Sequence, residues 1–297
     1  MLITAENIWF RYETEPADSF VLKDVSFTLN PGECVALVGP SGSGKSTLAQ
    51  ILNGLLRPDC GRLLIAAQPL EYKPKPLRDL RRRIGLVFQL PETQIFEATV
   101  FDEVAFAARQ CGIPASQIQS RVATALEMVG LDPDSYSNRN PLKLSGGEAR
   151  LVTVASLLVI NPDWLILDEP TLGLDSVHTR LIVAMIQKRH HSSRGVLLIT
   201  HDLDLALSLD SRTVVLNDGK IVFEGAAEEL LVKHDLRTGF GLAEPESLRL
   251  WKLLRNEVAG FALGDRCQII AAVAALPMDQ RQQVKQILQK SILAEAW

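Results

Sequence analysis

The chain has 297 residues, 47% of them hydrophobic, and a formal net charge of −4. This composition supports a sizeable core, and the charge gives no support for a nucleic-acid-binding face, so we expect no nucleic-acid partner. The longest apolar stretch, residues 151–160, is about half of what a membrane-spanning helix needs. The N-terminus has early acidic residues and no long apolar segment, so we expect no signal peptide. The cysteines are scattered, which is typical of a reducing compartment: Cys34, Cys60, Cys111 and Cys267.

The N-terminal residues alternate between apolar and polar positions over 2–10 and 21–29. This alternation predicts two antiparallel strands joined by a polar loop. An Asn-Pro-Gly-Glu turn at 30–33 leads into an apolar run at 34–38. A continuous run of that length predicts a buried strand of a parallel sheet.

A glycine-rich loop follows this strand and precedes a helical segment, and its sequence satisfies G-x-x-x-x-G-K-[S/T]. Backbone N–H groups of such a loop surround phosphates, and the helix N-terminus adds positive potential. We expect Lys45 to reach the outer phosphates of ATP and Ser46 to supply an oxygen to Mg²⁺. The predicted nucleotide-binding residues here are Gly39, Pro40, Ser41, Gly42, Ser43, Gly44, Lys45, Ser46 and Thr47.

The next part of the chain predicts a second strand–turn stretch and then a linker over 72–83 that is rich in Arg, Lys and Pro. We expect the arginines of this linker on a solvated surface. The apolar run 84–88 predicts another buried strand, which ends at Gln89. Residues 99–131 have a helical pattern with a break near 112–114.

A second glycine motif, Leu-Ser-Gly-Gly-Glu at 144–148, opens a helix that Asn161-Pro162 ends. A serine and two glycines ahead of a helix make an anion site by themselves. An apolar strand then ends in Asp168 and Glu169. Beside a phosphate-binding loop, we expect Asp168 to hold Mg²⁺ and Glu169 to be the general base that polarises the attacking water.

The C-terminal half predicts a strand at 195–199 followed by His201, a hairpin over 213–225, and an amphipathic helical end of about 60 residues. Strands alternate with helices along most of the chain, which predicts an α/β fold with a mainly parallel core sheet. In the C-terminal region, core packing and a contact between two subunits remain alternatives for one apolar face: Leu248, Trp251, Leu254 and Val258.

The motif at 144–148, about 20 residues ahead of a strand that ends in Asp-Glu, resembles the signature of ATP-binding cassette (ABC) proteins. The resemblance covers residues 1 to about 235. It implies the P-loop NTPase ABC-cassette fold, with a RecA-like core, an antiparallel β subdomain and a helical signature subdomain at about 90–160. The implied domains are an ABC ATPase domain at 1–234 and a C-terminal helical extension at 235–297.

The resemblance also implies roles for residues outside the phosphate-binding loop. In the family, the signature grips the γ-phosphate of ATP bound to a second subunit, so two composite sites form in a dimer. The residues that match this function are Ser145, Gly146 and Gly147, and Asp175 matches the loop that couples the two sites. Tyr12 matches the aromatic residue that stacks on adenine.

Two further positions match catalytic residues of the family. Gln89 matches the glutamine that senses Mg²⁺ and the attacking water, and His201 matches the histidine that contacts the γ-phosphate. The expected catalytic residues are therefore Glu169, His201, Gln89 and Lys45, and the expected metal-binding residues are Ser46, Gln89 and Asp168. Two positions depart from the usual pattern: Glu148 replaces the commoner glutamine, and Leu151 stands where a basic residue is common.

The segments 52–61, 88–106 and 240–250 resemble the ATPases of energy-coupling factor (ECF) importers, which include the cobalt-importer type. This implies an ATP-hydrolysing subunit that drives uptake of a vitamin or a transition-metal ion. The implied partners are a second ABC ATPase subunit, either a copy or a paralogue, an integral membrane scaffold and a substrate-binding membrane subunit. The implied location is peripheral, on the cytoplasmic face of the cell membrane.

Residues 90–106 mix apolar and acidic side chains without any Lys or Arg, which predicts an apolar groove with an acidic rim. Such a groove favours docking of a basic amphipathic helix from the scaffold. We expect contact from Glu92, Gln94, Phe96 and Glu97, and core packing from Phe101, Val104 and Phe106. One alternative is a soluble ABC ATPase acting on DNA or the ribosome. However, sustained heptads are missing between the two glycine motifs, and the chain holds one cassette. Another alternative, a regulator without turnover, would require the loss of Glu169.

Overall fold

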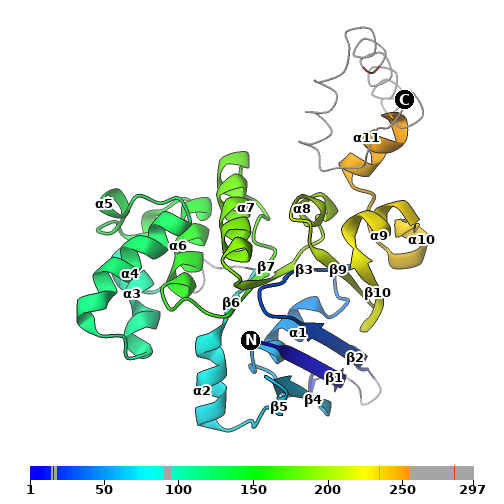
Figure 1. The fold of residues 1–297 in the computed structure, drawn as a ribbon, viewed down its shortest axis with the longest axis horizontal. Coiled ribbons are helices and arrows are strands. Elements are labelled where there is room, and N and C mark those ends of the chain that lie inside the picture. Colours follow the sequence, from blue (N-terminus) through cyan, green and yellow to red (C-terminus); the bar gives the residue numbers. More distant parts are fainter. Residues whose placement is uncertain (15, 17–18, 90–94, 234, 255–283, 285–297) are drawn as a thin grey trace.

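A six-stranded sheet forms the centre of the computed structural model, which describes residues 1–14, 16, 19–89, 95–233, 235–254 and 284 (Figure 1). The strand order is β10-β9-β3-β8-β7-β6, and only the β9–β10 pair is antiparallel. The strands of this sheet are apolar and largely buried, because both faces of a parallel sheet are covered, except the antiparallel edge strand, in which exposed and half-buried positions alternate. They are β3 (Cys34–Val38), β6 (Ile84–Val87), β7 (Trp164–Asp168), β8 (Gly195–Ile199), β9 (Arg212–Asn217) and β10 (Lys220–Ala226).

A second, antiparallel sheet has the strand order β2-β1-β4-β5. It contains β1 (Ile3–Phe10), β2 (Leu22–Leu29), β4 (Cys60–Ile65) and β5 (Gln68–Pro69), which confirms the predicted antiparallel N-terminal strands. The apolar side chains of α1 (Lys45–Leu52) are buried in one cluster with side chains of both sheets. The helix that follows the phosphate-binding loop therefore has a fixed position in the core.

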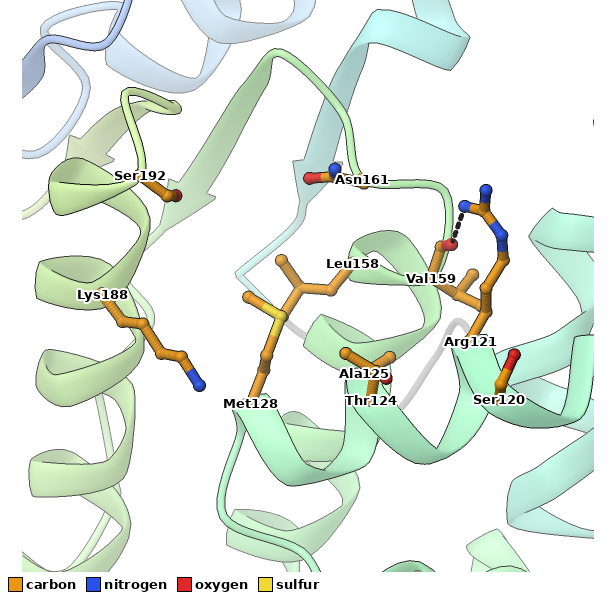
Figure 2. A pocket seen from close by; sticks show the side chains of 10 residues that line it. All are labelled: Ser120, Arg121, Thr124, Ala125, Met128, Leu158, Val159, Asn161, Lys188 and Ser192. Carbon is orange, nitrogen blue, oxygen red and sulfur yellow. Dashed lines mark hydrogen bonds between the residues drawn. The ribbon is translucent and has the colours of Figure 1, made fainter. Parts of the chain in front are cut away.

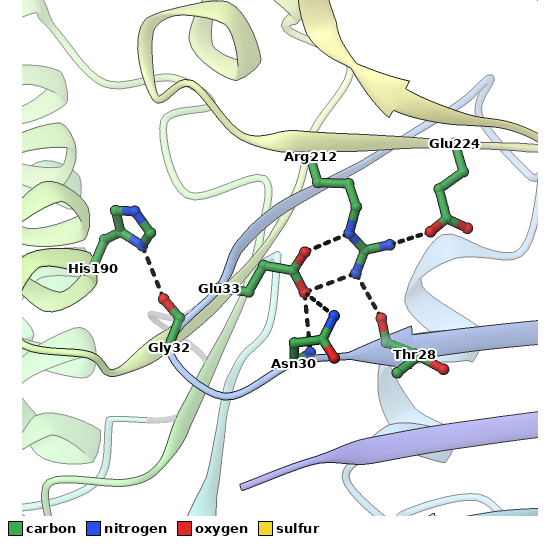
Figure 3. Close-up of polar contacts among 7 residues, drawn as sticks. All are labelled: Thr28, Asn30, Gly32, Glu33, His190, Arg212 and Glu224. Carbon is green, nitrogen blue, oxygen red and sulfur yellow. Dashed lines mark hydrogen bonds and ion pairs between the residues drawn. The ribbon is translucent and has the colours of Figure 1, made fainter.

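A polar network joins the antiparallel sheet to the parallel one (Figure 3). The guanidinium of Arg212, on β9, donates to both carboxylate oxygens of Glu33, at 2.5 and 2.9 Å, and to the carbonyl of Thr28, at 2.6 Å. It also pairs with Glu224 of β10 at 2.7 Å. Burial alone would raise the pKa of the Glu33 carboxyl. The pKa is instead lowered, because Arg212 stabilises the charge of the carboxylate.

The segment expected to be a linker at 72–83 is instead largely a helix, α2 (Pro74–Arg83). Its prolines suggested irregular structure, but Pro74 and Pro76 occupy the first turn, where N–H groups have no intrahelical partner and proline is tolerated. As expected, all four of its arginines lie on the surface, while Leu80 is buried.

Four helices pack together beside the parallel sheet, at the left of Figure 1. The predicted break near 112–114 is confirmed, because one helix ends and the next begins there. The helices are α3 (Val100–Gln110), α4 (Ala115–Met128), α5 (Pro133–Tyr136) and α6 (Gly146–Leu158), with a 3₁₀ turn at Pro141–Lys143. None of the helices in the described part of the chain has an apolar stretch long enough to cross a bilayer.

The C-terminal helices within the described residues pack on the core rather than standing apart. The side chains of Leu236, Phe240 and Leu248 are buried in a cluster with Ala36 and Val38 of β3. This favours core packing for Leu248 and the half-buried Trp251, whereas the side chain of Leu254 and all of Val258 lie outside the described part. The remaining helices are α7 (Ser176–His191), α8 (Leu203–Ser208), α9 (Ala227–Lys233), α10 (Leu236–Phe240) and α11 (Glu246–Leu254).

Candidate nucleotide-binding site

The parallel strands bring most predicted functional residues to one edge of the sheet. The phosphate-binding loop, residues 39–47, follows β3, and Gln89 follows β6. Glu169 follows β7, and His201 follows β8 after one residue. The carboxyl ends of parallel strands meet at the same edge, which is where open α/β sheets bind ligands.

Two glycines of the phosphate-binding loop are required by packing. Gly44 has φ 103°, and a Cβ there would lie 2.8 Å from the Leu22 side chain and 3.0 Å from the carbonyl oxygen of Val21. A Cβ at Gly39 would lie 2.0 Å from the carbonyl oxygen of Leu216. The loop therefore follows a path that only glycine permits, which leaves its backbone close to any bound phosphate.

The ammonium of Lys45 lies within this loop. It donates hydrogen bonds to the carbonyl oxygens of Gly39, at 2.9 Å, and Pro40, at 2.8 Å. Burial lowers the pKa of Lys45, while the charges of Glu169 and Asp168 oppose that shift. The Ser43 hydroxyl is buried and has no hydrogen-bond partner among the described residues. An unpaired buried hydroxyl beside a lysine fits a loop that surrounds an anion.

The predicted metal ligands Ser46 and Asp168 lie next to each other. The Ser46 hydroxyl makes a side-chain hydrogen bond with the Asp168 carboxyl. Burial raises the pKa of Asp168, and the bond to Ser46 and the charge of Lys45 oppose that shift. A hydroxyl and a carboxylate are hard oxygen donors of the kind that Mg²⁺ prefers, so the two residues fit the predicted metal site.

Glu169, the predicted general base, is held by the end of β8. One carboxylate oxygen, Oε1, lies 2.9 Å from Nδ1 of His201, and the other accepts a 3.3 Å hydrogen bond from the Thr200 hydroxyl. Glu169 has φ 49°, and its N–H donates to the carbonyl of Ile199 at 2.9 Å. A left-handed conformation at a non-glycine residue is costly and often occurs where a side chain must point in one direction.

Arg150 is a functional candidate that the sequence analysis missed. Its guanidinium donates to the carbonyl oxygens of Glu169 at 3.0 Å, Leu172 at 2.9 Å and Gln89 at 3.1 Å. The residue is 7% exposed. One buried cation thus ties the signature helix to the segments that follow β6 and β7. Leu151 stands where a basic residue is common, and Arg150 directly precedes it. That neighbouring arginine was the available signal, since Leu151 itself is buried in the apolar core.

Tyr12, the predicted adenine-stacking residue, lies against the phosphate-binding loop. Its hydroxyl is 3.0 Å from the Thr47 hydroxyl, and its ring contacts Phe10 edge to face at 5.0 Å. The residue is 38% exposed. The position and exposure of the Tyr12 ring leave it available to adenine, and the stacking role stays a prediction.

The signature turn, residues 145–147, begins α6 with a complete capping box. The Ser145 hydroxyl accepts from the N–H of Glu148, and the Glu148 carboxylate accepts from the N–H of Ser145 at 2.9 Å. The Tyr136 hydroxyl donates to Glu148 at 2.6 Å and lowers the pKa of that carboxyl. Glu148 therefore fulfils the structural role of the commoner glutamine, because either side chain can complete this box.

Asp175 lies at the N-terminus of α7, where its carboxylate accepts from the N–H groups of Val177 and His178. For the residues that the structure describes, no hydrogen bond joins Asp175 or the signature turn to the phosphate-binding loop of the same chain. Within the part of the chain that the structure describes, the one hydrogen bond of Gln89 at this edge is that of its carbonyl oxygen with Arg150, so the role of its side chain at Mg²⁺ stays a prediction. The predicted residues thus form one cluster at the sheet edge and a second one at the starts of α6 and α7.

The comparisons with known proteins agree with this arrangement. The sequence profile described as ABC transporter matches residues 22–172. The chain is 42% identical over 235 residues to the energy-coupling factor transporter ATP-binding protein EcfA2 of Symbiobacterium thermophilum, covering 79% of this chain and 81% of the relative. The chain belongs to the ABC transporter family of ATP-binding proteins. It is an ATP-binding and ATP-hydrolysing cassette.

Two solved structures show the same fold. One is CbiO1 of Clostridium perfringens, described as part of the ABC transporter complex CbiONQ, with a TM-score of 0.72, 30% identity, and coverage of 85% of this chain and 94% of the other. The second is a dimeric ATP-binding cassette in a post-hydrolysis state bound to ADP and Pi, with a TM-score of 0.70 and 28% identity. It covers 76% of this chain and 98% of the other. The cassette fold predicted from the sequence is confirmed.

A groove of about 760 Å³ in this cassette lies between α2, α3 and α6. The rings of Phe96 and Phe106 meet edge to face at 4.8 Å on its wall and are 60% and 37% exposed. Phe106 was expected in the core but faces the groove, whereas Val104 is buried as expected. The Glu103 carboxylate accepts from the N–H groups of Phe96 and Glu97 and so holds that segment on α3. The predicted contact residues Glu92 and Gln94 lie outside the described part.

The described lining of the groove is basic rather than acidic, which differs from the expected acidic rim. Its described lining includes Arg78, Arg81 and Arg82 of α2, and its one acid, Glu103, is 5% exposed. The arginines are distant in sequence from 90–106, so the pattern of that segment alone did not indicate them. Among the described residues, the exposed charged side chains that line the groove are therefore basic.

A second pocket, of about 390 Å³, lies between α4, the end of α6 and the end of α7 (Figure 2). Met128 and Leu158 lie between Lys188 on one side and Arg121 on the other. Arg121 donates to the carbonyl of Val159 at 3.4 Å. The pocket adjoins the segments that enter β7 and β8, at the opposite edge of the sheet from the phosphate-binding loop, and is separate from the nucleotide site.

Proposed function

We propose that this cassette is the ATP-hydrolysing subunit of an energy-coupling factor importer, which takes up a vitamin or a transition-metal ion through membrane partners. The observation that carries the catalytic part is the Glu169 carboxylate, held by His201 and Thr200 beside the lysine and the aspartate of the phosphate-binding edge. The relatives named as energy-coupling factor ATP-binding proteins support the importer part.

Each residue at the edge has a distinct role in this proposal. The phosphate-binding loop and Lys45 bind the phosphates of ATP, and Tyr12 stacks on adenine. Ser46 and Asp168, with Gln89, hold Mg²⁺, which when bound neutralises charge on the phosphates. Glu169 accepts a proton from the attacking water, and His201 keeps its carboxylate oriented and contacts the γ-phosphate. These side chains position the reacting groups and stabilise the developing charge.

The proposed working unit is a pair of cassettes, either two copies or this chain with a paralogue. The hydroxyl and N–H of Ser145 are bonded to Glu148 in the capping box, whereas no hydrogen bond from the N–H groups of Gly146 and Gly147 is found among the described residues. These two first-turn N–H groups are therefore available to the partner's nucleotide, and the Ser145 hydroxyl can reach it by exchanging its bond to Glu148. Exposed apolar side chains flank the signature turn and Asp175: Leu142, Leu172 and Val177. An exposed apolar group beside unsatisfied donors is typical of an interface.

The proposed docking site for the membrane scaffold is the groove between α2, α3 and α6. Phe96 and Phe106 offer an apolar anchor point, and Arg78 and Arg82 lie on the opposite wall. An amphipathic helix that inserts apolar side chains and presents acidic groups to α2 fits these features. The cassette then acts as a peripheral subunit on the cytoplasmic face of the membrane.

The test is recovery of the intact complex from its native membranes. A tagged wild-type chain should retain an integral membrane scaffold in stoichiometric amount, and a Phe96→Ala, Phe106→Ala double variant should lose it while the purified subunit still hydrolyses ATP. Val222→Ala is the matched control, because Val222 is 45% exposed on β10, away from the groove. Recovery of no membrane protein with the wild type, or equal recovery with the double variant, would contradict the proposal.

A further inference from the structure

The first turn of α7 holds the Asp175 carboxylate by both of its oxygens. Oδ1 accepts from the N–H groups of Val177 at 2.8 Å and His178 at 2.9 Å, and Oδ2 lies 2.9 Å from Nδ1 of His178. The two backbone donors already complete the helix cap. The imidazole contact is therefore additional, and it fixes a carboxylate whose side chain is 62% exposed.

The same imidazole lies against the signature turn. A Cβ at Gly147 would lie 2.9 Å from Cγ and 3.0 Å from Nδ1 of His178. At Gly146, by contrast, a Cβ would have no atom within 4 Å. Within this chain, packing thus requires only the second glycine of the signature, and the reason is the ring of His178.

The His178 ring therefore joins two elements that a cassette directs at the opposite subunit, the signature turn and Asp175. We propose that His178 is a positioning residue that keeps these two elements at a fixed spacing, so that both reach the partner's nucleotide together. The proposal rests on the composite site of the proposed function. The ring acts on both elements because it contacts the Asp175 carboxylate and packs against Gly147, so it ties the starts of α6 and α7 together.

The test measures ATP-dependent dimerisation in a Glu169→Gln background, where ATP is not consumed. His178→Ala and His178→Phe both remove the imidazole contact to Oδ2 of Asp175, and each should raise the concentration required for dimerisation about tenfold, the effect of losing one hydrogen bond to a charged group. His178→Asn places an amide N–H at the position of Nδ1 and should restore dimerisation to within about threefold of the parent. Binding of ATP to the monomer should not change in any variant.

His190→Ala is the matched control, because His190 lies at the other end of α7 and its Nδ1 contacts the carbonyl of Gly32 at 2.9 Å. Normal dimerisation by His178→Ala, equal weakening by His190→Ala, or no recovery with His178→Asn would each overturn the proposal. Normal dimerisation by His178→Phe would overturn the role of the Asp175 contact.

A second measurement separates this inference from the pairing on which it rests. Hydrogen exchange of the monomer should be faster at residues 147–150 in His178→Ala than in His190→Ala. These residues lie on α6 and both substitutions lie on α7, so faster exchange there reports the lost contact between the two helices. If the Glu169→Gln parent stays monomeric in Mg-ATP, pairing with a copy is wrong. In that case, faster exchange at 147–150 supports the positioning role of His178, and unchanged exchange overturns it.

Discussion

Nδ1 of His201 lies 2.9 Å from Oε1 of Glu169, and this contact joins the ends of β8 and β7 at the nucleotide-binding edge. The two residues are 32 positions apart in sequence, and parallel pairing of their strands brings them together. Glu169 is largely buried, with 12% of its side chain exposed, whereas His201 is 65% exposed. The histidine therefore reaches from the solvent side towards a carboxylate whose direction the backbone already sets.

The first prediction concerns Glu169→Gln. The amide keeps the shape of the carboxylate and its contact with His201 but cannot accept a proton from water. Hydrolysis should fall by about 10²–10⁴-fold, the usual contribution of a general base. ATP binding, measured by equilibrium titration, should remain, because Lys45 and Asp168 are unchanged. Steady-state hydrolysis at the wild-type rate would show that Glu169 is not the base.

The second prediction concerns Lys45→Ala, which removes the ammonium from the phosphate-binding loop. Hydrolysis should be abolished and ATP affinity sharply reduced, because the main cation facing the outer phosphates is lost. Lys188→Ala is the control, since Lys188 lines the pocket at the opposite edge of the sheet. ATP titration and a phosphate-release assay measure the two effects. Near-normal turnover by Lys45→Ala would contradict the assigned nucleotide site.

The third prediction concerns Arg150→Lys. A lysine keeps the charge but cannot donate to three carbonyl oxygens in different segments. The free energy of unfolding should fall by about 2 kcal/mol, because buried acceptors lose their partner. The kcat for hydrolysis should fall with little change in ATP affinity, since the backbones of Gln89 and Glu169 lose a common support.

Arg121→Lys is the control for that variant, because Arg121 makes one long hydrogen bond of 3.4 Å on α4. Its free energy of unfolding should change by less than about 0.5 kcal/mol. Chemical denaturation measures both proteins. Equal losses of unfolding free energy in the two variants would show that the three carbonyl contacts of Arg150 stabilise the fold no more than the single contact of Arg121.

The fourth prediction concerns Ser145→Arg in the Glu169→Gln background. The long side chain should block closure of two cassettes, while monomeric ATP binding stays largely intact because the signature turn does not contact its own phosphate-binding loop. Light scattering with and without Mg-ATP measures the result. Ser120→Arg, a substitution on exposed α4, should dimerise as the parent does. Dimerisation by the Ser145→Arg protein would exclude a composite site built on this turn.

The fifth prediction concerns Tyr136→Phe and its dependence on pH. Tyr136 is the largest cause of the lowered pKa of Glu148, so the ionised carboxylate stabilises the fold above the unfolded pKa of about 4.5. At pH 7 the variant should lose about 1 kcal/mol of unfolding free energy. The loss should shrink as the pH falls below 4.5 through the folded pKa, because Glu148 becomes protonated in both proteins.

Tyr72→Phe serves as the control for this pH series. The Tyr72 hydroxyl is buried without a hydrogen-bond partner among the described residues, so its removal should not destabilise the protein. Denaturation curves from pH 3.5 to about 7 compare the variants with the wild type across the window in which Glu148 titrates. A loss for Tyr136→Phe that stays constant over this range would exclude Glu148 as the partner that matters.

The features that the sequence determined are those whose chemistry lies in contiguous residues. The phosphate-binding loop is one example, because Gly44 supplies its left-handed torsion and Lys45 bonds to the carbonyl oxygens of Gly39 and Pro40 within six residues. The signature turn is another, because Ser145 and Glu148 complete their capping box within four residues. The apolar strands and the helix break near 112–114 were also readable, since burial and turn chemistry act over a few residues.

Tertiary structure alone decided the relationships between distant segments. Arg150 reaches Gln89 across 61 positions, and His178 meets Gly147 because α6 and α7 start side by side. Likewise, α2 brings arginines to the groove beside Phe96, and Phe106 faces that groove rather than the core. No local pattern encodes these contacts, because each depends on how packed helices turn relative to the sheet. The sequence thus determined which groups this protein carries, and close packing of its elements decided which of them meet.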